Sequence, residues 1–117
     1  MKPTAETAVS GADDARAALA AAARGGGAAI LVGDAASGGA GWFRALVEMV
    51  TRERPEVAVT AILECHDRPG LVLAGLRAGL SDLRFSGPPE VSARLAALAA
   101  AAGARLHHGG ADAESSA

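Results

Sequence analysis

The chain has few aromatic side chains and a single cysteine. Only 3% of its 117 residues are aromatic, with two phenylalanines, one tryptophan and no tyrosine, although 50% are hydrophobic. A core in such a chain must be built from Leu, Val, Ile and Ala, within the single domain that this length allows. One cysteine excludes an intramolecular disulfide framework. Together with the lack of a visible secretory signal, it predicts a cytoplasmic protein.

The sequence also lacks a block of like charges and a long apolar run. Its formal net charge is -2, and the basic residues, nearly all arginine, are scattered singly. This pattern argues against a nucleic acid or an anionic membrane surface as partner. No apolar run reaches the roughly 18 residues that a membrane span requires. We therefore expect neither a nucleic-acid nor a membrane partner.

The clearest structural signal lies between residues 57 and 87. Val57–Leu63 is a nearly continuous apolar run rich in β-branched residues, which predicts a strand buried on both faces at the centre of a sheet. A helix over Pro69–Leu80 follows, with Pro69 suited to its first turn and Gly79 to the left-handed residue that ends it. Asp82–Ser86 then predicts a second strand. The segment is a βαβ unit.

The rest of the chain repeats this alternation of strand and helix. Further helices are predicted over Asp13–Arg24, Trp42–Arg54 and Pro89–Ala102, and further strands over Ala28–Val32 and Ala104–His107. The predicted fold class is α/β, with a small parallel sheet of about four strands in two or three layers, flavodoxin-like or receiver-like. It forms one domain over residues 12–108. We expect a flexible N-terminal tail (1–11) and a disordered C-terminal tail (109–117).

The helices differ in how much apolar surface they can bury. Three carry an apolar stripe, whereas Asp13–Arg24 offers Leu19 and a run of alanines. If the strands lie in sequential order, the three striped helices share one face and little remains to cover the other. This predicts a homodimer. A strand order that reverses direction would instead let a monomer suffice.

From Pro55 onward the segments PEVAVTAILECHD, LVLAGLRAGLSDLRF and SGPPEVSARLAAL resemble the C-terminal half of bacterial response-regulator receiver domains. The resemblance covers about half of the chain and implies receiver-like βα repeats and a regulatory role. The phosphorylation chemistry of that family does not carry over. Glu64 stands at the position of the switch Thr or Ser and Ser86 at that of the essential Lys. The phosphoacceptor position falls near Gly33, with Asp34 one residue off.

Three segments should meet where the parallel strands end, because ligands of such sheets bind outside the carboxyl ends. They are Gly33–Gly41, Glu64–Asp67 and Ser86–Pro88. The first is glycine-rich and precedes a helix, so its backbone N–H groups could hold a small anionic ligand. The alternative is a tight strand-to-helix connection with Ser37 as the helix cap. The candidate ligand-binding residues are Asp34, Ser37, Gly38, Gly39, Glu64, His66 and Ser86.

Catalytic and metal sites have weaker support. The candidate catalytic residues are Cys65 and Asp67, but consecutive Cys65, His66 and Asp67 cannot converge on one atom from an extended backbone. Cys65 is either an active thiol or a buried apolar filler. Trp42 either stacks on a ligand or shields a helix–sheet seam. No histidine spacing matches a metal-ligand pattern, so we expect no metal and no cofactor.

Two functions remain open on these grounds. The first is a small non-catalytic binding or regulatory module that acts through protein–protein interaction, as a homodimer. The alternative is a small-molecule or anion-binding protein, or an enzyme, that uses loop 33–41 with Glu64, Cys65 and Asp67. A pocket at the strand ends that contains an anion or a thiol of depressed pKa favours the alternative, and a filled-in strand edge with an exposed apolar face favours the first.

Overall fold

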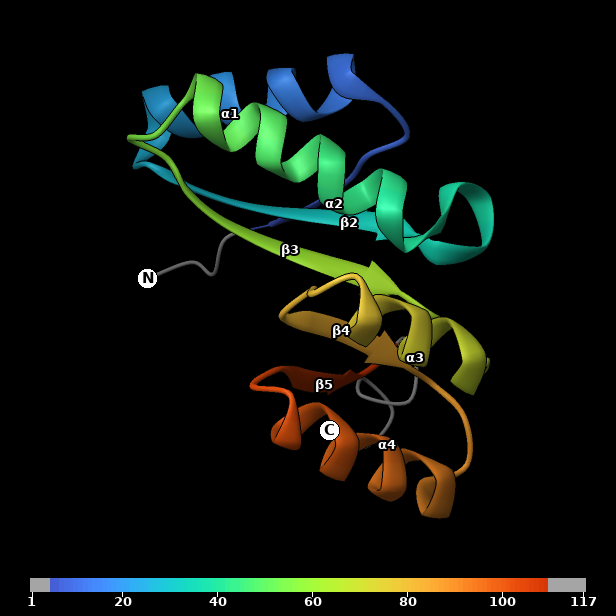
Figure 1. Ribbon diagram of the computed structural model, residues 1–117. Coiled ribbons are helices and arrows are strands. Elements are labelled where there is room, and N and C mark those ends of the chain that lie inside the picture. Colours follow the sequence, from blue (N-terminus) through green and yellow to red (C-terminus); the bar gives the residue numbers. More distant parts are fainter. Residues whose placement is uncertain (1–4, 110–117) are drawn as a thin grey trace.

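The computed structural model describes residues 5–109, which form one parallel sheet with helices between successive strands (Figure 1). This confirms the predicted α/β class in a single domain, with five strands where about four were expected. The strands are β1 (Glu6–Ala8), β2 (Ala28–Asp34), β3 (Ala58–Glu64), β4 (Asp82–Phe85) and β5 (Arg105–His108). The helices are α1 (Ala12–Gly25), α2 (Ala35–Glu53), α3 (Pro69–Arg77) and α4 (Pro89–Ala101).

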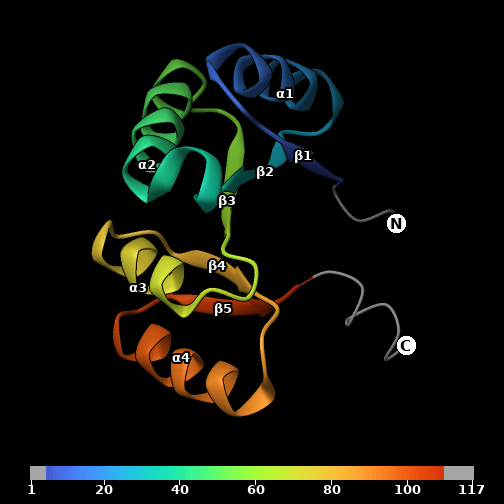
Figure 2. The same cartoon turned by 90° about the vertical axis from the view of Figure 1, so that its right-hand side faces the viewer.

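The strands lie in sequential order, from β1 at one edge to β5 at the other. Right-handed crossovers in this order place every helix on the same side, and Figure 2 shows α1 to α4 along one face of a curved sheet. The structure is therefore the two-layer alternative. Its other face carries no helix from the described residues.

The apolar run after Val57 forms β3, the middle strand, as predicted. It is less buried than a strand covered on both faces would be. Leu63 on the helix side and Ile62 on the opposite side are buried, whereas Ala58 is exposed and Thr60 half-buried. Burial therefore increases toward the carboxyl end of β3, and only one face of the strand is packed under helices.

Strand β1 is an addition to the predicted sheet. Residues 6–8 were expected in a flexible N-terminal tail, but they pair in parallel with β2, with Glu6 opposite Ile30. The strand is only three residues long, and all three are exposed. So short a segment cannot show the alternation of apolar and polar residues by which a strand is predicted. Residues 1–4 of the expected N-terminal tail and residues 110–117 of the expected C-terminal tail lie outside the described residues.

The core fills the space between the sheet and the helix layer. Strands β2, β3 and β4 contribute Leu31, Leu63 and Leu83, all fully buried. The two phenylalanines, Phe43 of α2 and Phe85 of β4, are the largest fully buried side chains. Helix α1 contributes little apolar surface to the core, as its sequence predicted, and buries Ala15 and Leu19.

Helix α2 spans 19 residues and is interrupted at Gly39. It buries Phe43, Leu46 and Val50 on one side, while Arg44 and Glu48 form an exposed ion pair at 3.6 Å on another. Its surface is thus amphipathic. Within residues 5–109 no helix combines the length and the apolar character needed to cross a bilayer.

Gly33 of β2 lets the ring of Phe43 pack directly on the strand. A Cβ at this position would overlap the ring, which is fully buried and has little room to move. We expect Gly33→Ala to lower the free energy of unfolding by about 1–3 kcal/mol through overpacking. Urea unfolding followed by circular dichroism measures the change.

Gly41→Ala is the matched control for that substitution. Gly41 lies inside α2, and a Cβ there would meet nothing within 4 Å. Alanine has the higher helix propensity, so this variant should gain about 0.5–1 kcal/mol. Equal stability of the two variants would contradict the close packing of Gly33 on Phe43.

Candidate functional site

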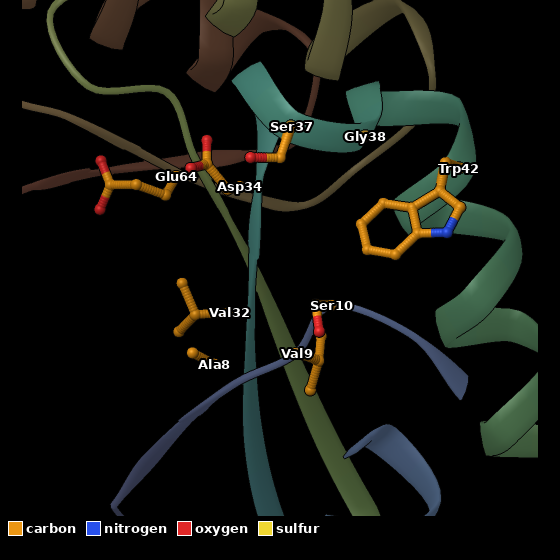
Figure 3. Close-up of a pocket in the computed structure, with 9 residues that line it drawn as sticks. All are labelled: Ala8, Val9, Ser10, Val32, Asp34, Ser37, Gly38, Trp42 and Glu64. Atoms are coloured by element: carbon orange, nitrogen blue, oxygen red, sulfur yellow. The ribbon is translucent and has the colours of Figure 1, made fainter. Parts of the chain in front are cut away.

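A pocket of about 580 Å³ opens at the carboxyl ends of β1, β2 and β3 (Figure 3). Its position is the one predicted for ligands of a parallel sheet, and its volume lies within the range of small-molecule sites. The lining residues come from the three strand ends, from the loop after β1 and from the start of α2. They are Ala8, Val9, Ser10, Val32, Asp34, Ser37, Gly38, Trp42 and Glu64.

The glycine-rich segment shapes one wall of this pocket. The chain leaves β2 in a helical turn, breaks helical geometry at Gly39 (φ 84°, ψ 164°) and continues as the longer part of α2. A Cβ on Gly38 would lie 2.5 Å from the ring of Trp42, so the missing side chain lets the indole lie against the backbone. Figure 3 shows the indole across the pocket from Asp34. The glycines thus serve to place Trp42.

Asp34 caps this first turn, in place of the expected Ser37. Its carboxylate accepts a hydrogen bond from the Ala36 N–H at 2.9 Å. The Nε2 of His66 lies 3.0 Å from the same carboxylate oxygen. The hydrogen bond from His66, followed by that from Ala36, holds the pKa of Asp34 below its usual range. Asp34 is therefore ionised at neutral pH.

His66 is held in an unusual backbone conformation. Its φ of 55° is the only positive value at a non-glycine residue in the described part of the chain. Two hydrogen bonds maintain it: the His66 N–H donates to the Glu64 carboxylate at 3.0 Å, and the His66 carbonyl accepts from the Ser86 N–H at 2.8 Å. Such strain is concentrated at functional sites in proteins. The backbone conformation of His66 positions its imidazole ring against Asp34.

An arginine ties the strands together across the helix-free face. Arg84 of β4 donates through Nε to Glu64 at 2.8 Å and through both Nη atoms to Glu6 at 2.9 and 3.0 Å. Glu6 belongs to β1, three strands away, which is about 14 Å across a flat sheet. The contact therefore depends on the curl of the sheet. Arg84 also lowers the pKa of Glu6 through the hydrogen bonds between them.

The wall of the pocket is negatively charged. It contains two carboxylates, Asp34 and Glu64, and no lysine, arginine or histidine. Arg84 offsets the charge of Glu64, whereas Asp34 has only the exposed His66 beside it. Asp34 also occupies the helix N-terminus at which an anion was expected. The small anionic ligand stays a prediction, and this geometry argues for a ligand of opposite charge.

Of the predicted ligand-binding residues, Asp34, Ser37, Gly38 and Glu64 line the pocket. Gly39 lies at the break in α2. His66 and Ser86 do not line the pocket: His66 contacts Asp34, and the Ser86 N–H donates to the His66 carbonyl. The sequence did not indicate Ala8, Val9 or Ser10, because they follow a strand too short to predict. Arg84 was also missed, although a charge between Leu83 and Phe85 in a short apolar strand was a visible signal.

The candidate catalytic residues do not reach the pocket. Cys65 is fully buried, and its thiol donates to the Leu63 carbonyl at 3.5 Å. Burial, and then the nearby charge of Glu64, raise the pKa of Cys65 to about 12. Of the two interpretations given above, Cys65 therefore fits the buried apolar residue and not the active thiol. Asp67 is exposed and lies outside the lining, and residues 5–109 contain no cluster of three side chains suited to a metal ion.

The chain matches no model of a protein family, and searches of curated proteins and of solved structures also returned no match. Function must therefore follow from the geometry of this site.

Proposed function

We propose that the chain binds a small organic cation, a protonated amine or a quaternary ammonium group, in the pocket at the ends of β1, β2 and β3. One observation carries this proposal: the ionised carboxylate of Asp34 and the indole of Trp42 line the same cavity from opposite sides (Figure 3). A cation bound against the indole ring is also attracted to this carboxylate. Each cation–π contact contributes about 0.5–2 kcal/mol.

The remaining walls suit the rest of such a ligand. Ser10 and Ser37 add hydroxyl groups to the lining; the Ser10 hydroxyl donates to the Asp14 carboxylate at 2.7 Å and therefore faces a ligand only as an acceptor. Val32, Ala8 and Val9 offer apolar surface for carbon atoms. Mostly apolar walls with a few convergent polar groups are typical of small-molecule sites.

The charged groups are already in place before a ligand arrives. His66 and Ala36 hold the Asp34 carboxylate, and Arg84 holds that of Glu64. Binding therefore requires little ordering of side chains, which would otherwise reduce affinity.

Trp42 makes the proposal directly testable, because it is the only tryptophan of the chain. Its fluorescence should change and saturate on titration with tetramethylammonium, choline or putrescine. The neutral analogue tert-butanol and the anions phosphate and acetate should leave it unchanged. A saturable response to phosphate with none to the ammonium compounds would contradict the proposal and restore the anion hypothesis.

Asp34→Asn removes the charge and keeps the shape. Asparagine is as good a helix cap as aspartate, so the turn that carries Ser37 should persist. We expect the affinity for the ammonium compounds to fall by about tenfold or more, about 1.4 kcal/mol. Asp67→Asn is the matched control, with the same change of charge at the same end of the sheet but outside the pocket. If both variants lose affinity equally, the effect is one of net charge and not of Asp34.

A second candidate is the protein-interaction module that we also inferred from the sequence. The helix-free face of the sheet supports it, and the resemblance to receiver domains favours a regulatory role for it. A cytoplasmic location stays a prediction.

A further inference from the structure

The polar side chains that line the pocket are two carboxylates and two hydroxyls. They are Asp34, Glu64, Ser10 and Ser37. An ionised carboxylate only accepts hydrogen bonds, whereas a hydroxyl can also donate one. The direction in which the two serine hydroxyls donate therefore decides what kind of ligand these four side chains can bind.

The Ser10 hydroxyl donates to a carboxylate of the chain and not to the cavity. Its Oγ lies 2.7 Å from Oδ2 of Asp14, and the Ser10 N–H donates to the same oxygen at 2.9 Å. The backbone bond, followed by the hydroxyl bond, holds the pKa of Asp14 below its usual range. Asp14 is therefore ionised at neutral pH and has no proton to give back. Ser10 keeps only its lone pairs for a ligand.

The donors next to Asp34 are used in the same way. Because this carboxylate is ionised, the His66 Nε2 at 3.0 Å must be the donor of the bond between them. The pKa of Asp34 is lowered first by this bond with His66 and, to a smaller extent, by a hydrogen bond from the Ser37 side chain. Figure 3 shows the benzene ring of Trp42 turned toward the cavity and the indole nitrogen on its far side. The polar side chains of the described lining thus face the cavity as acceptors.

The two carboxylates differ in how much acceptor capacity they keep. Each oxygen of Glu64 accepts one bond, from the Arg84 Nε at 2.8 Å and from the His66 N–H at 3.0 Å. At Asp34, Oδ1 accepts both printed bonds, from the Ala36 N–H and from the His66 ring. The second oxygen of Asp34 therefore keeps room for a donor from a ligand.

We propose that the ligand of this pocket is a cation that carries N–H donors, a primary ammonium or a guanidinium group, and that a quaternary ammonium group is selected against. This inference rests on the proposed function, since it concerns the ligand of the same cavity. The cationic group donates to Asp34 and to the Ser37 hydroxyl, which belong to the same turn at the start of α2. The Ser10 oxygen accepts from a further donor of the ligand.

The aromatic part of the wall supports the same choice. Quaternary ammonium groups are bound in cages of several aromatic rings, whereas Trp42 is the only aromatic residue among those that line this pocket. A quaternary group would leave the acceptors of the wall without donors. A site built to form hydrogen bonds rejects an analogue that cannot form them, because its polar groups are then left unpaired.

Four isomeric cations test the inference. The compounds n-butylammonium, diethylammonium, ethyldimethylammonium and tetramethylammonium contain the same atoms and one positive charge, but their number of N–H donors falls from three to none. We expect their affinities, measured by Trp42 fluorescence, to fall in this order, by about tenfold or more from first to last. Equal or tighter binding of tetramethylammonium would overturn this inference and leave the cation pocket standing. If none of the four binds, the proposed function fails and the inference fails with it.

Ser37→Ala tests whether the hydroxyl oxygen is responsible. The preference for n-butylammonium over tetramethylammonium should shrink by about threefold or more in this variant. Each ligand pays the same hydration cost in both chains, so this cost cancels when the two preferences are compared. The matched control is Ser81→Ala, at an exposed serine just before β4, at the opposite end of the sheet, and it should keep the full preference. An unchanged preference in a Ser37→Ala chain with native circular dichroism would refute the role of the hydroxyl acceptor.

Discussion

Replacing Arg84 by Met should destabilise the chain by about 3 kcal/mol, whereas Arg16→Met should have a much smaller effect. Both arginines bind a glutamate through two nitrogens, at closely similar distances: Arg84 contacts Glu6 at 2.9 and 3.0 Å, and Arg16 contacts Glu53 at 3.0 and 3.0 Å. The two pairs differ mainly in burial. They form a matched comparison within one protein.

The physical reason is the environment of each guanidinium. The Arg84 side chain is 16% exposed and that of its second partner Glu64 is 21% exposed, whereas Arg16 and Glu53 are 48% and 42% exposed. Removing Arg84 leaves a poorly solvated Glu64 carboxylate without its counter-charge. Removing Arg16 leaves Glu53 in water. The expected loss for Arg84 lies at the lower end of the range for buried pairs, because Glu6 is itself half-exposed.

The pH dependence of Arg84→Met provides an independent readout. Arg84 lowers the pKa of Glu6 below 4.5 in the folded chain. The resulting stabilisation is present above pH 4.5 and is lost as the pH falls through the folded pKa. In Arg84→Met this loss should shrink, so the two chains should differ less in stability at acid pH than at pH 7. Parallel urea unfolding curves at pH 7 and pH 3 measure it. An equal difference at both values would show that Arg84 acts through packing and not through charge.

Native Cys65 should react with iodoacetamide at pH 8 about a thousandfold more slowly than in the urea-unfolded chain. The thiolate is the reactive form. A pKa of about 12, against about 8.5 for a free thiol, reduces the thiolate population by roughly this factor. Burial restricts access further. Mass spectrometry of the alkylated fraction over time gives both rates.

A relocated thiol is the control for this experiment. Ala17 lies exposed on α1, and Ala17→Cys in a Cys65→Ala chain should react at nearly the unfolded rate when folded. If native Cys65 reacts within tenfold of this control, the strand end opens readily. The thiol would then return as a candidate nucleophile.

Local patterns in the sequence were enough to predict four of the five strands and the parallel direction of the sheet. The apolar run at Val57 and the prolines and glycines around it indicated a βαβ unit, because hydrophobic period and turn chemistry act over a few residues. Alternation of strand and helix then implied parallel pairing. The same reasoning located the site at the strand ends, where Asp34, Ser37, Gly38 and Glu64 do meet.

Four features depended on contacts between distant residues. Arg84 and Glu6 are 78 positions apart, and their contact requires β1, a strand too short to show a period. Strand order left one face free of helices. The pocket is negatively charged because Asp34 lines it while Arg84 pairs with the glutamates. Cys65 lies on the buried side of the sheet, and this decided that it is an apolar core residue and not an active thiol. Sequence periodicity and turn residues determined most of the strands and helices. Only tertiary packing decided which charges and faces meet, because those energies depend on the distance and burial of groups that the chain brings together on folding.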